Sequence, residues 1–162
     1  MLIRSATPAD AATIAAIYDH HARTGSASFD NEGPDSAAWE AKVADVLARG
    51  WPFLVAEDAG EVIGFAYATQ FRDRPGYRFT CEDSIYLDPA STGKGIGSKL
   101  LEQVIAAARA FGFEQMIAVV GGGEPASVGL HRAFGFEERG RMRDVGTKFG
   151  RKFDTVYLQL KL

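Results

Sequence analysis

The stretch Thr92-Gly93-Lys94-Gly95-Ile96-Gly97-Ser98-Lys99 decides the fold class of this chain. It stands between a strand-like segment, Glu82 to Leu87, which Asp88-Pro89 ends, and the strongest helical pattern in the sequence, Ile96 to Phe111. Alternating glycines allow several backbone N–H groups to point at one place, and the start of a helix adds partial positive charge there. Such a loop is suited to binding a phosphate or pyrophosphate group.

Three classes of phosphate-binding loop can be compared with this stretch. A P-loop requires a glycine five residues before Gly93, and that position is Asp88. A Rossmann fingerprint requires a glycine where Ser98 stands, and it normally opens a β-α-β unit, whereas this loop lies in mid-chain. The third class is the pyrophosphate loop of N-acetyltransferases that use acetyl-CoA. A turn that only caps the helix needs fewer glycines, because each one costs backbone entropy.

Hydrophobic periodicity on both sides of the loop predicts an α/β fold with the order β-α-α-β-β-β-α-β-α-β-β. We find no internal repeat and no linker, so we expect a single domain over residues 1–162. The helices are expected from Thr7-Pro8-Ala9-Asp10 through His21, and over Asp35–Arg49, Ile96–Phe111 and Ala126–Phe134. The strands are expected at Leu2–Ala6, Phe53–Glu57, Glu61–Thr69, Glu82–Leu87, Gln115–Val120, Phe136–Arg141 and Thr155–Leu160.

Composition and charge exclude several classes of function. The 162 residues carry 18 Lys+Arg and 21 Asp+Glu, a formal net charge of −3, which argues against nucleic-acid binding as the main function. No apolar run approaches the roughly 20 residues that span a bilayer, and the polar N-terminus has no signal-peptide region. We therefore expect a cytoplasmic protein with no membrane or nucleic-acid partner.

Neither a metal site nor a cysteine mechanism is indicated. Cys81 is the single cysteine, so an intramolecular disulfide and a multi-cysteine zinc site are excluded. The neighbouring Glu82 and Asp83 would raise the pKa of its thiol, which favours a structural role over an acetylated intermediate. His20 and His21 are adjacent and have no evident third ligand at a useful spacing.

Three stretches together resemble the GCN5-related N-acetyltransferases. They are Ser84-Ile85-Tyr86-Leu87-Asp88-Pro89, Gly93-Lys94-Gly95-Ile96-Gly97 and Leu130-His131-Arg132-Ala133-Phe134-Gly135-Phe136. Three more resemble the phosphinothricin and methionine sulfoximine acetyltransferase branch of that family. These are Ala27-Ser28-Phe29, the arginine-rich Phe71-Arg72-Asp73-Arg74-Pro75-Gly76-Tyr77-Arg78, and Val145-Gly146-Thr147-Lys148-Phe149-Gly150-Arg151.

The resemblance implies a mixed, mostly antiparallel central sheet flanked by helices, with a splayed strand pair at the cofactor site. It also implies direct transfer of acetyl from acetyl-CoA to the α-amine of a small amino-acid-like acceptor, in a ternary complex without metal. Another small amine or a protein N-terminus is an alternative acceptor. A non-catalytic acyl-CoA-binding module and a nucleotide-binding protein are alternatives of a different class.

The resemblance places the cofactor on residues that flank and form the glycine loop: Ile85, Tyr86, Leu87, Gly93, Lys94, Gly95, Ile96, Gly97, Ser98, Glu124 and Ser127. Three positions depart from the pattern of the family. Thr92 stands where the loop usually opens with Arg or Gln, and Glu124 replaces an Asn that can donate to the cofactor arm. Asp83 replaces a His that is common in the branch.

Two residues are the candidates for proton transfer. An acceptor amine is mostly protonated at pH 7, so a base has to remove a proton. Glu82 is that candidate, because it opens the strand that leads into the glycine loop and its motif position faces the substrate in the family. His131 stands where many relatives have a tyrosine near the cofactor sulfur, and it could act as the general acid. The alternative is that His131 is packed between Leu130 and Phe134.

The acceptor is expected to contact arginines, which bind carboxylates in a bidentate manner. The expected set is Phe29, Arg72, Arg74, Tyr77, Arg78, Glu82, Asp83 and Ser84. Residues 139 to 152 hold six basic side chains opposed only by Asp144. Resemblance places part of this run near a dimer interface that closes the pocket, so a homodimer is expected.

Overall fold

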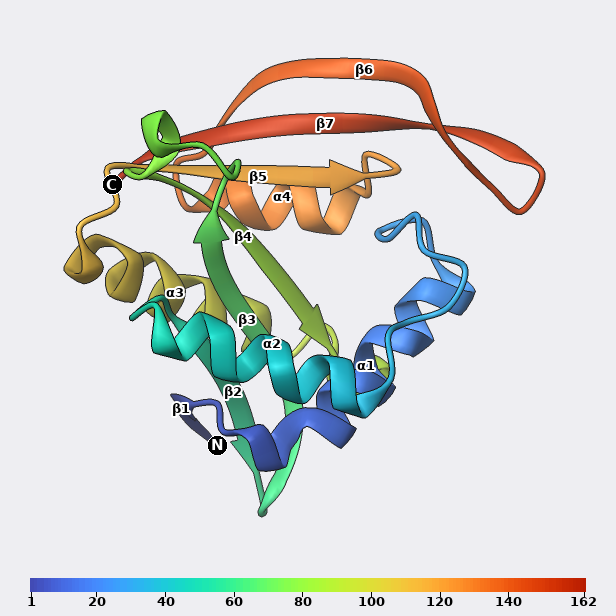
Figure 1. Ribbon diagram of the computed structural model, residues 1–162. Helices are drawn as coiled ribbons and strands as arrows, with labels where there is room; N and C mark the ends of the chain where they lie inside the picture. Colours follow the sequence, from blue (N-terminus) through green and yellow to red (C-terminus); the bar gives the residue numbers. More distant parts are fainter.

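The computed structural model describes residues 1–162, whose seven strands form one open sheet in the order β1-β2-β3-β4-β5-β7-β6 (Figure 1). Neighbouring strands are antiparallel except β4 and β5, which are parallel. The bounds are β1 Leu2–Ser5, β2 Phe53–Asp58, β3 Glu61–Gln70, β4 Thr80–Leu87, β5 Gln115–Gly121, β6 Glu137–Lys148 and β7 Arg151–Lys161. The predicted mostly antiparallel sheet is confirmed.

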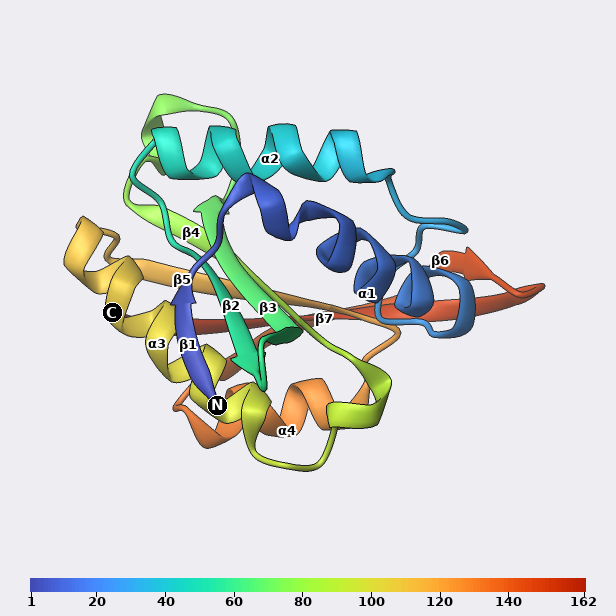
Figure 2. The same cartoon turned by 90° about the horizontal axis from the view of Figure 1, so that it is seen from below.

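Four helices cover the two faces of the sheet, as Figure 2 shows from below. Helices α1 (Ala11–Thr24) and α2 (Ser36–Ala48) lie on one face, and α3 (Ile96–Phe111) and α4 (Pro125–Ala133) lie on the other. Each face has its own hydrophobic core: Trp39 and Phe65 are buried on the α1/α2 side, and Leu100 and Met116 on the α3/α4 side. Three short 3-10 turns, η1 (Pro8–Asp10), η2 (Pro75–Tyr77) and η3 (Pro89–Ser91), join these elements.

Helix α3 begins and ends where the sequence predicts. Gly95 precedes it with φ +76° and Gly112 follows it with φ +112°, left-handed conformations that favour glycine. Between them, Leu100, Leu101, Val104 and Ala108 are buried against the sheet. Helix α3 therefore has a fixed start directly after the glycine loop.

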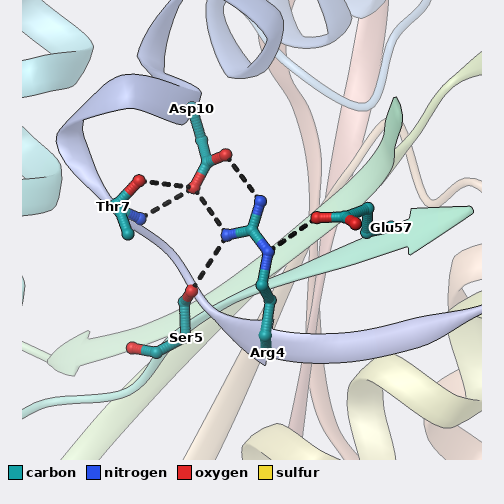
Figure 3. A network of polar contacts seen from close by, with 5 residues as sticks. All are labelled: Arg4, Ser5, Thr7, Asp10 and Glu57. Carbon is teal, nitrogen blue, oxygen red and sulfur yellow. Dashed lines mark hydrogen bonds and ion pairs between the residues drawn. The ribbon is translucent and has the colours of Figure 1, made fainter. Parts of the chain in front are cut away.

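An ion-pair network fixes the N-terminal strand (Figure 3). Arg4 donates two hydrogen bonds of 2.9 Å to the Asp10 carboxylate and one of 2.8 Å to Glu57 on β2. Asp10 also accepts the backbone N–H of Thr7 at 2.7 Å, which confirms the predicted helix-start pattern. The Arg4 guanidinium holds the pKa of Asp10 below its usual value. The network ties β1 to β2 and to the start of α1.

The C-terminal hairpin is longer than the sequence indicates. Strands at Phe136–Arg141 and Thr155–Leu160 are predicted, but β6 and β7 together span residues 137–161 with only Phe149 and Gly150 between them. In Figure 1 the end of this hairpin extends past the rest of the sheet. The first nine residues of β6 are all exposed, so this part of the strand lacks the alternation of buried and exposed residues that marks a strand in a sequence. A register irregularity between Met142 and Gly146 interrupts the pairing further.

The parallel strands β4 and β5 separate halfway along their length. Their pairing runs from Thr80 opposite Gln115 to Asp83 opposite Ala118, although β4 continues to Leu87 and β5 to Gly121. Figure 1 shows the two strands diverging beyond this point. The expected splayed strand pair is thus present. No helix is long and apolar enough to cross a membrane.

Candidate active site

A cavity of about 120 Å³ occupies the gap between β4 and β5. Its walls come from the end of each strand, from the loop after α1 and from α4. The lining residues are Ala27, Glu82, Asp83, Ser84, Ile85, Tyr86, Ala118, Val119, Val120, Gly121, Ser127 and His131. Beyond Asp83 and Ala118 the two strands no longer pair with each other, so part of the wall is backbone that faces the gap.

A larger groove of about 360 Å³ runs from this gap toward the start of α3. Seven of the eleven predicted cofactor residues line it: Ile85, Tyr86, Leu87, Gly93, Gly97, Glu124 and Ser127. Gly93 and Gly95 have φ values of +72° and +76°, and a Cβ added at either would meet no atom within 4 Å. The loop is therefore open toward solvent at the N-terminus of a 16-residue helix, which fits a pyrophosphate group.

The other four predicted cofactor residues have different surroundings. The Ile96 side chain is buried in the core on the α3/α4 side. The Lys94 ammonium donates to the backbone oxygen of Ala90 at 2.8 Å, and Gly95 and Ser98 are exposed. The side chains of Lys94 and Ile96 are thus engaged within the protein, whereas backbone N–H groups of this part of the loop and the exposed Ser98 could contact a phosphate.

The groove includes residues that sequence reasoning missed. His21 from α1 lines it and its Nε2 donates to the backbone oxygen of Leu87 at 2.7 Å. Ala126 and Leu130 from α4 also line it. No local pattern in the sequence indicates that α1 crosses the end of β4, where His21 meets Leu87. Glu124 accepts the backbone N–H of Ser127 at 3.0 Å and so caps α4.

Glu82 and Asp83 point to opposite faces of the sheet, because successive residues of a strand alternate. Glu82 lies on the α1/α2 face, where its carboxylate is 3.7 Å from the Arg72 guanidinium. Burial raises the pKa of Glu82, and the charge of Arg72 opposes that shift only in part. Tyr67 of β3 is directly opposite Ser84, so Glu82, Ser84 and Tyr67 line one stretch of this face.

Asp83 lies on the α3/α4 face and contacts His131 rather than the arginine loop. His131 Nε2 is 2.9 Å from Asp83 Oδ2, and the two side chains are 3% and 1% exposed. Burial disfavours the charged imidazole, but the Asp83 carboxylate outweighs it, so the pKa of His131 is raised. The His131 ring is packed in the protein interior, and it also lines the gap cavity.

The predicted acceptor residues are only partly brought together. Arg72 reaches Glu82 and stacks on the Phe71 ring at 4.1 Å. Arg74, Tyr77 and Arg78 are exposed on the loop around η2, and Arg78 stacks on Phe79 at 4.4 Å. Only Arg72 of these arginines is paired with a carboxylate of the gap.

Phe29 joins the loop after α1 to the C-terminal hairpin. Its ring packs against Gly146 of β6, where an added Cβ would lie 2.4 Å from the ring. Beside it, the buried Lys148 ammonium donates to the backbone oxygen of Ser28 at 2.7 Å. Burial lowers the pKa of Lys148. No local pattern indicated this contact, because Lys148 stands in a run of basic residues of the kind that usually forms a solvated surface.

Cys81 is buried on the same face as Asp83, and burial raises the pKa of its thiol. A protonated, buried thiol is a poor nucleophile, which agrees with the structural role expected for this residue. The structure contains no cluster of three or more His, Cys, Asp or Glu side chains arranged to hold a metal ion.

Comparison with known proteins matches residues 14–136 to a model of the acetyltransferase (GNAT) family. The phosphinothricin N-acetyltransferase of Alcaligenes faecalis is 49% identical over 154 residues, which cover 94% of this chain and 78% of that protein. The L-methionine sulfoximine/L-methionine sulfone acetyltransferase of Pseudomonas paraeruginosa is 44% identical over 162 residues, 99% of this chain and 94% of that one.

A solved structure has the same fold over nearly the whole length of this chain. The GNAT superfamily phosphinothricin acetyltransferase from Sinorhizobium meliloti, in complex with AcCoA, superimposes with a TM-score of 0.97 at 44% identity. The match covers 99% of this chain and 88% of that one. The family model, the sequence relatives and the shared fold lead to one conclusion: this chain belongs to the GNAT family and is an N-acetyltransferase.

Proposed function

We propose that the chain acetylates the α-amine of a small amino-acid acceptor of the phosphinothricin, methionine sulfoximine or methionine sulfone type, with acetyl-CoA as donor. The names of the two sequence relatives support this acceptor class. The observation that carries the proposal is the strand gap, which has Glu82 and Arg72 at its α1/α2 face and shares lining residues, such as Ile85 and Ser127, with the groove that leads to α3. The strands from Leu2 to Lys161 form one sheet with helices on both faces, which supports a single domain.

Acetyl-CoA supplies an activated acyl group as a thioester. The open backbone at Gly93 and Gly95 and the N-terminus of α3 would hold its pyrophosphate. Backbone N–H groups of β4 between Ile85 and Leu87 would bind and polarise the acyl carbonyl, since donors fixed in a dry site favour developing negative charge. Leu87, Leu130 and Ala126 give the groove an apolar wall for the cofactor arm.

Glu82 is the proposed general base. Its raised pKa brings the carboxylate closer to the pH at which the enzyme operates, which improves proton abstraction from the acceptor ammonium. Arg72, 3.7 Å away, keeps the carboxylate ionised and can also bind the acceptor carboxylate in a bidentate manner. Phe29, Arg74, Tyr77 and Arg78 are further proposed contacts of the acceptor. His131 is the proposed general acid for the departing sulfur.

The decisive experiment measures free thiol released from acetyl-CoA with a panel of acceptors. The panel contains phosphinothricin, methionine sulfoximine, methionine sulfone, ordinary amino acids, polyamines and an N-terminal peptide. Turnover confined to the first three compounds supports the proposal. Turnover only with another amine or the peptide would replace the acceptor, and binding of acetyl-CoA without any turnover would indicate an acyl-CoA-binding module.

We also propose a cytoplasmic homodimer in which the β6–β7 hairpin contacts a second copy. Strand β6 is an edge strand, and Met142, Val145 and Phe149 are 45%, 52% and 57% exposed along the hairpin. An edge strand with exposed apolar side chains readily pairs with another chain. A monomeric mass in light scattering at micromolar concentration would contradict the dimer.

A further inference from the structure

His131 and Asp83 form a buried pair beside the strand gap. The imidazole Nδ1 donates to the backbone oxygen of Ser127 at 2.7 Å, and Nε2 is 2.9 Å from Asp83 Oδ2. The edge of the ring also packs against Phe136, with centroids 4.9 Å apart. Both side chains line the gap cavity although they are shielded from bulk solvent. The pair thus has a fixed geometry and faces the reaction space.

The hydrogen bonds determine how many protons the pair holds. A carbonyl oxygen can only accept, so Nδ1 must carry a proton. The contact between Nε2 and Oδ2 requires one more proton, which is either on the imidazolium or on the carboxylic acid. In both cases the pair is electrically neutral overall. Its loss of that proton would leave a net negative charge in a buried site, which is unfavourable.

The second carboxylate oxygen of Asp83 has no protein partner. Oδ1 is buried and accepts no hydrogen bond, a situation that is uncommon for an ionisable group. Asp83 lines a cavity of about 120 Å³ that also presents Ser84 and Ser127, which is large and polar enough for water. An unpartnered oxygen beside this cavity is able to accept a hydrogen bond from a molecule that enters the gap.

The other charged groups around the pair do not replace Asp83. Cys81 lies on the same face of β4 and is held as a neutral thiol, while Glu82 lies on the opposite face. Arg132, next to His131 on α4, is exposed and paired with Glu138. The cavity wall from β5, residues 118–121, has no titratable side chain. Asp83 is therefore the charge that decides whether His131 is protonated.

We propose that Asp83 and His131 act as one acid, in which Asp83 is the positioning residue that orients the imidazole and keeps the transferable proton at Nε2. This inference rests on the proposed function. During transfer the carbon–sulfur bond breaks and the carbon–nitrogen bond forms. Glu82 takes one proton from the acceptor ammonium and passes it to solvent, and the nitrogen loses its second proton to Glu82 as the carbon–nitrogen bond forms. The pair gives its shared proton to the sulfur. Glu82 then releases its proton to solvent and the pair takes one up, so that the reaction releases one net proton.

The proton count is tested by nitrogen-15 NMR of the full chain without ligand. The chain has three histidines, so a His131→Gln variant assigns the signal. We expect both ring nitrogens of His131 to be protonated at pH 7.5, and only Nδ1 to be protonated in Asp83→Asn, whose amide can donate to Nε2. A wild-type ring that is neutral at pH 7.5 would overturn the inference. This measurement needs only the wild-type protein and His131→Gln, so it decides the matter even where Asp83→Asn does not fold.

Kinetics test the role of the pair. We expect Asp83→Asn to lower kcat at pH 8 by about 100-fold, within the usual range for acid–base groups, and to move the alkaline limb of kcat to lower pH. The acetyl-CoA dissociation constant should change less than twofold. Asp58→Asn, at the end of β2, is the matched control. An unchanged pH profile in Asp83→Asn overturns the inference while acetyl transfer stands, whereas a wild-type protein that turns over no acceptor overturns the proposed function instead.

Discussion

Replacement of Gly146 by alanine should disturb the acceptor site from the hairpin side. Three atoms of the Phe29 ring lie 2.4, 2.4 and 2.8 Å from the position of the added Cβ, and ordinary contact begins at 3.4 Å. The ring must therefore move by about 1 Å. Gly146 does not have a positive φ, so alanine adds no backbone strain. The clash with Phe29 is the dominant effect of the substitution.

The expected consequence is large for activity and small for stability. Phe29 is 37% exposed and the clash involves the far end of its ring, so the free energy of unfolding should fall by about 1 kcal/mol, the low end for overpacking. A displacement of 1 Å in a group that positions substrate can cost on the order of 100-fold in rate. We expect kcat/KM for the acceptor to fall about 10- to 100-fold, and the acetyl-CoA dissociation constant to stay constant.

Steady-state thiol release and urea unfolding measure the two effects. Gly140→Ala is the matched control, because Gly140 lies on the same strand and an added Cβ there meets nothing within 4 Å. In a Phe29→Ala background, Gly146→Ala should have no further effect on kcat/KM. A Gly146→Ala enzyme within twofold of the wild-type kcat/KM would refute the reasoning that Phe29 contributes to acceptor binding.

Three further predictions concern charged groups. Glu82→Gln should lower kcat at pH 7 by about 100-fold or more, with acetyl-CoA binding unchanged in calorimetry. The variant should also have a higher Tm at pH 7, because burial raises the pKa of Glu82 and disfavours its ionised form in the folded state. A kcat that is unchanged across pH contradicts the role of Glu82. Because the pKa of His131 is raised in the folded state, its protonation stabilises the fold fully at pH values below the pKa of the unfolded chain, and this stabilisation is lost as pH rises through the folded-state pKa. The wild type should therefore lose stability relative to His131→Gln between pH 6 and 9 in urea titrations. Asp10→Ala should cost about 1–3 kcal/mol, because Arg4 loses one of its two carboxylate partners and keeps only Glu57. The difference should shrink as pH falls through the lowered pKa of Asp10, and an equal Cm for both proteins at pH 7 would oppose the prediction.

Local patterns predicted the elements whose signals lie in adjacent residues. Gly95 and Gly112 bound a helix with a clear apolar stripe, so α3 is predicted correctly from Ile96 to Phe111. The Thr7–Asp10 pattern likewise predicts the start of the first helical segment. Strand β6 could not be read in this way, because it is exposed on both faces over most of its length and lacks the alternation that marks a strand.

Local sequence patterns could not predict the contacts between residues that are far apart in the chain. Asp83 and His131 are 48 residues apart, and only the packing of α4 against the sheet brings them together. The alternation of strand residues already separates Glu82 from Asp83, which would have removed Asp83 from the acceptor side. Lys148 and Ser28 are 120 residues apart, and their contact depends on the bend of a hairpin whose length the sequence did not reveal.

The early end of the β4–β5 pairing also affects the rigidity of the sheet and the rate at which its amide hydrogens exchange. Four residue pairs, Thr80–Gln115 to Asp83–Ala118, are all that join the strands β1–β4 to the strands β5, β7 and β6 within the sheet. A ligand in the gap would lie between the main chains of β4 and β5 and would link the two halves of the sheet where these strands do not pair. The donor substrate would then stiffen the molecule as well as react in it, and amide hydrogens along the open ends of β4 and β5 would exchange more slowly when it is bound.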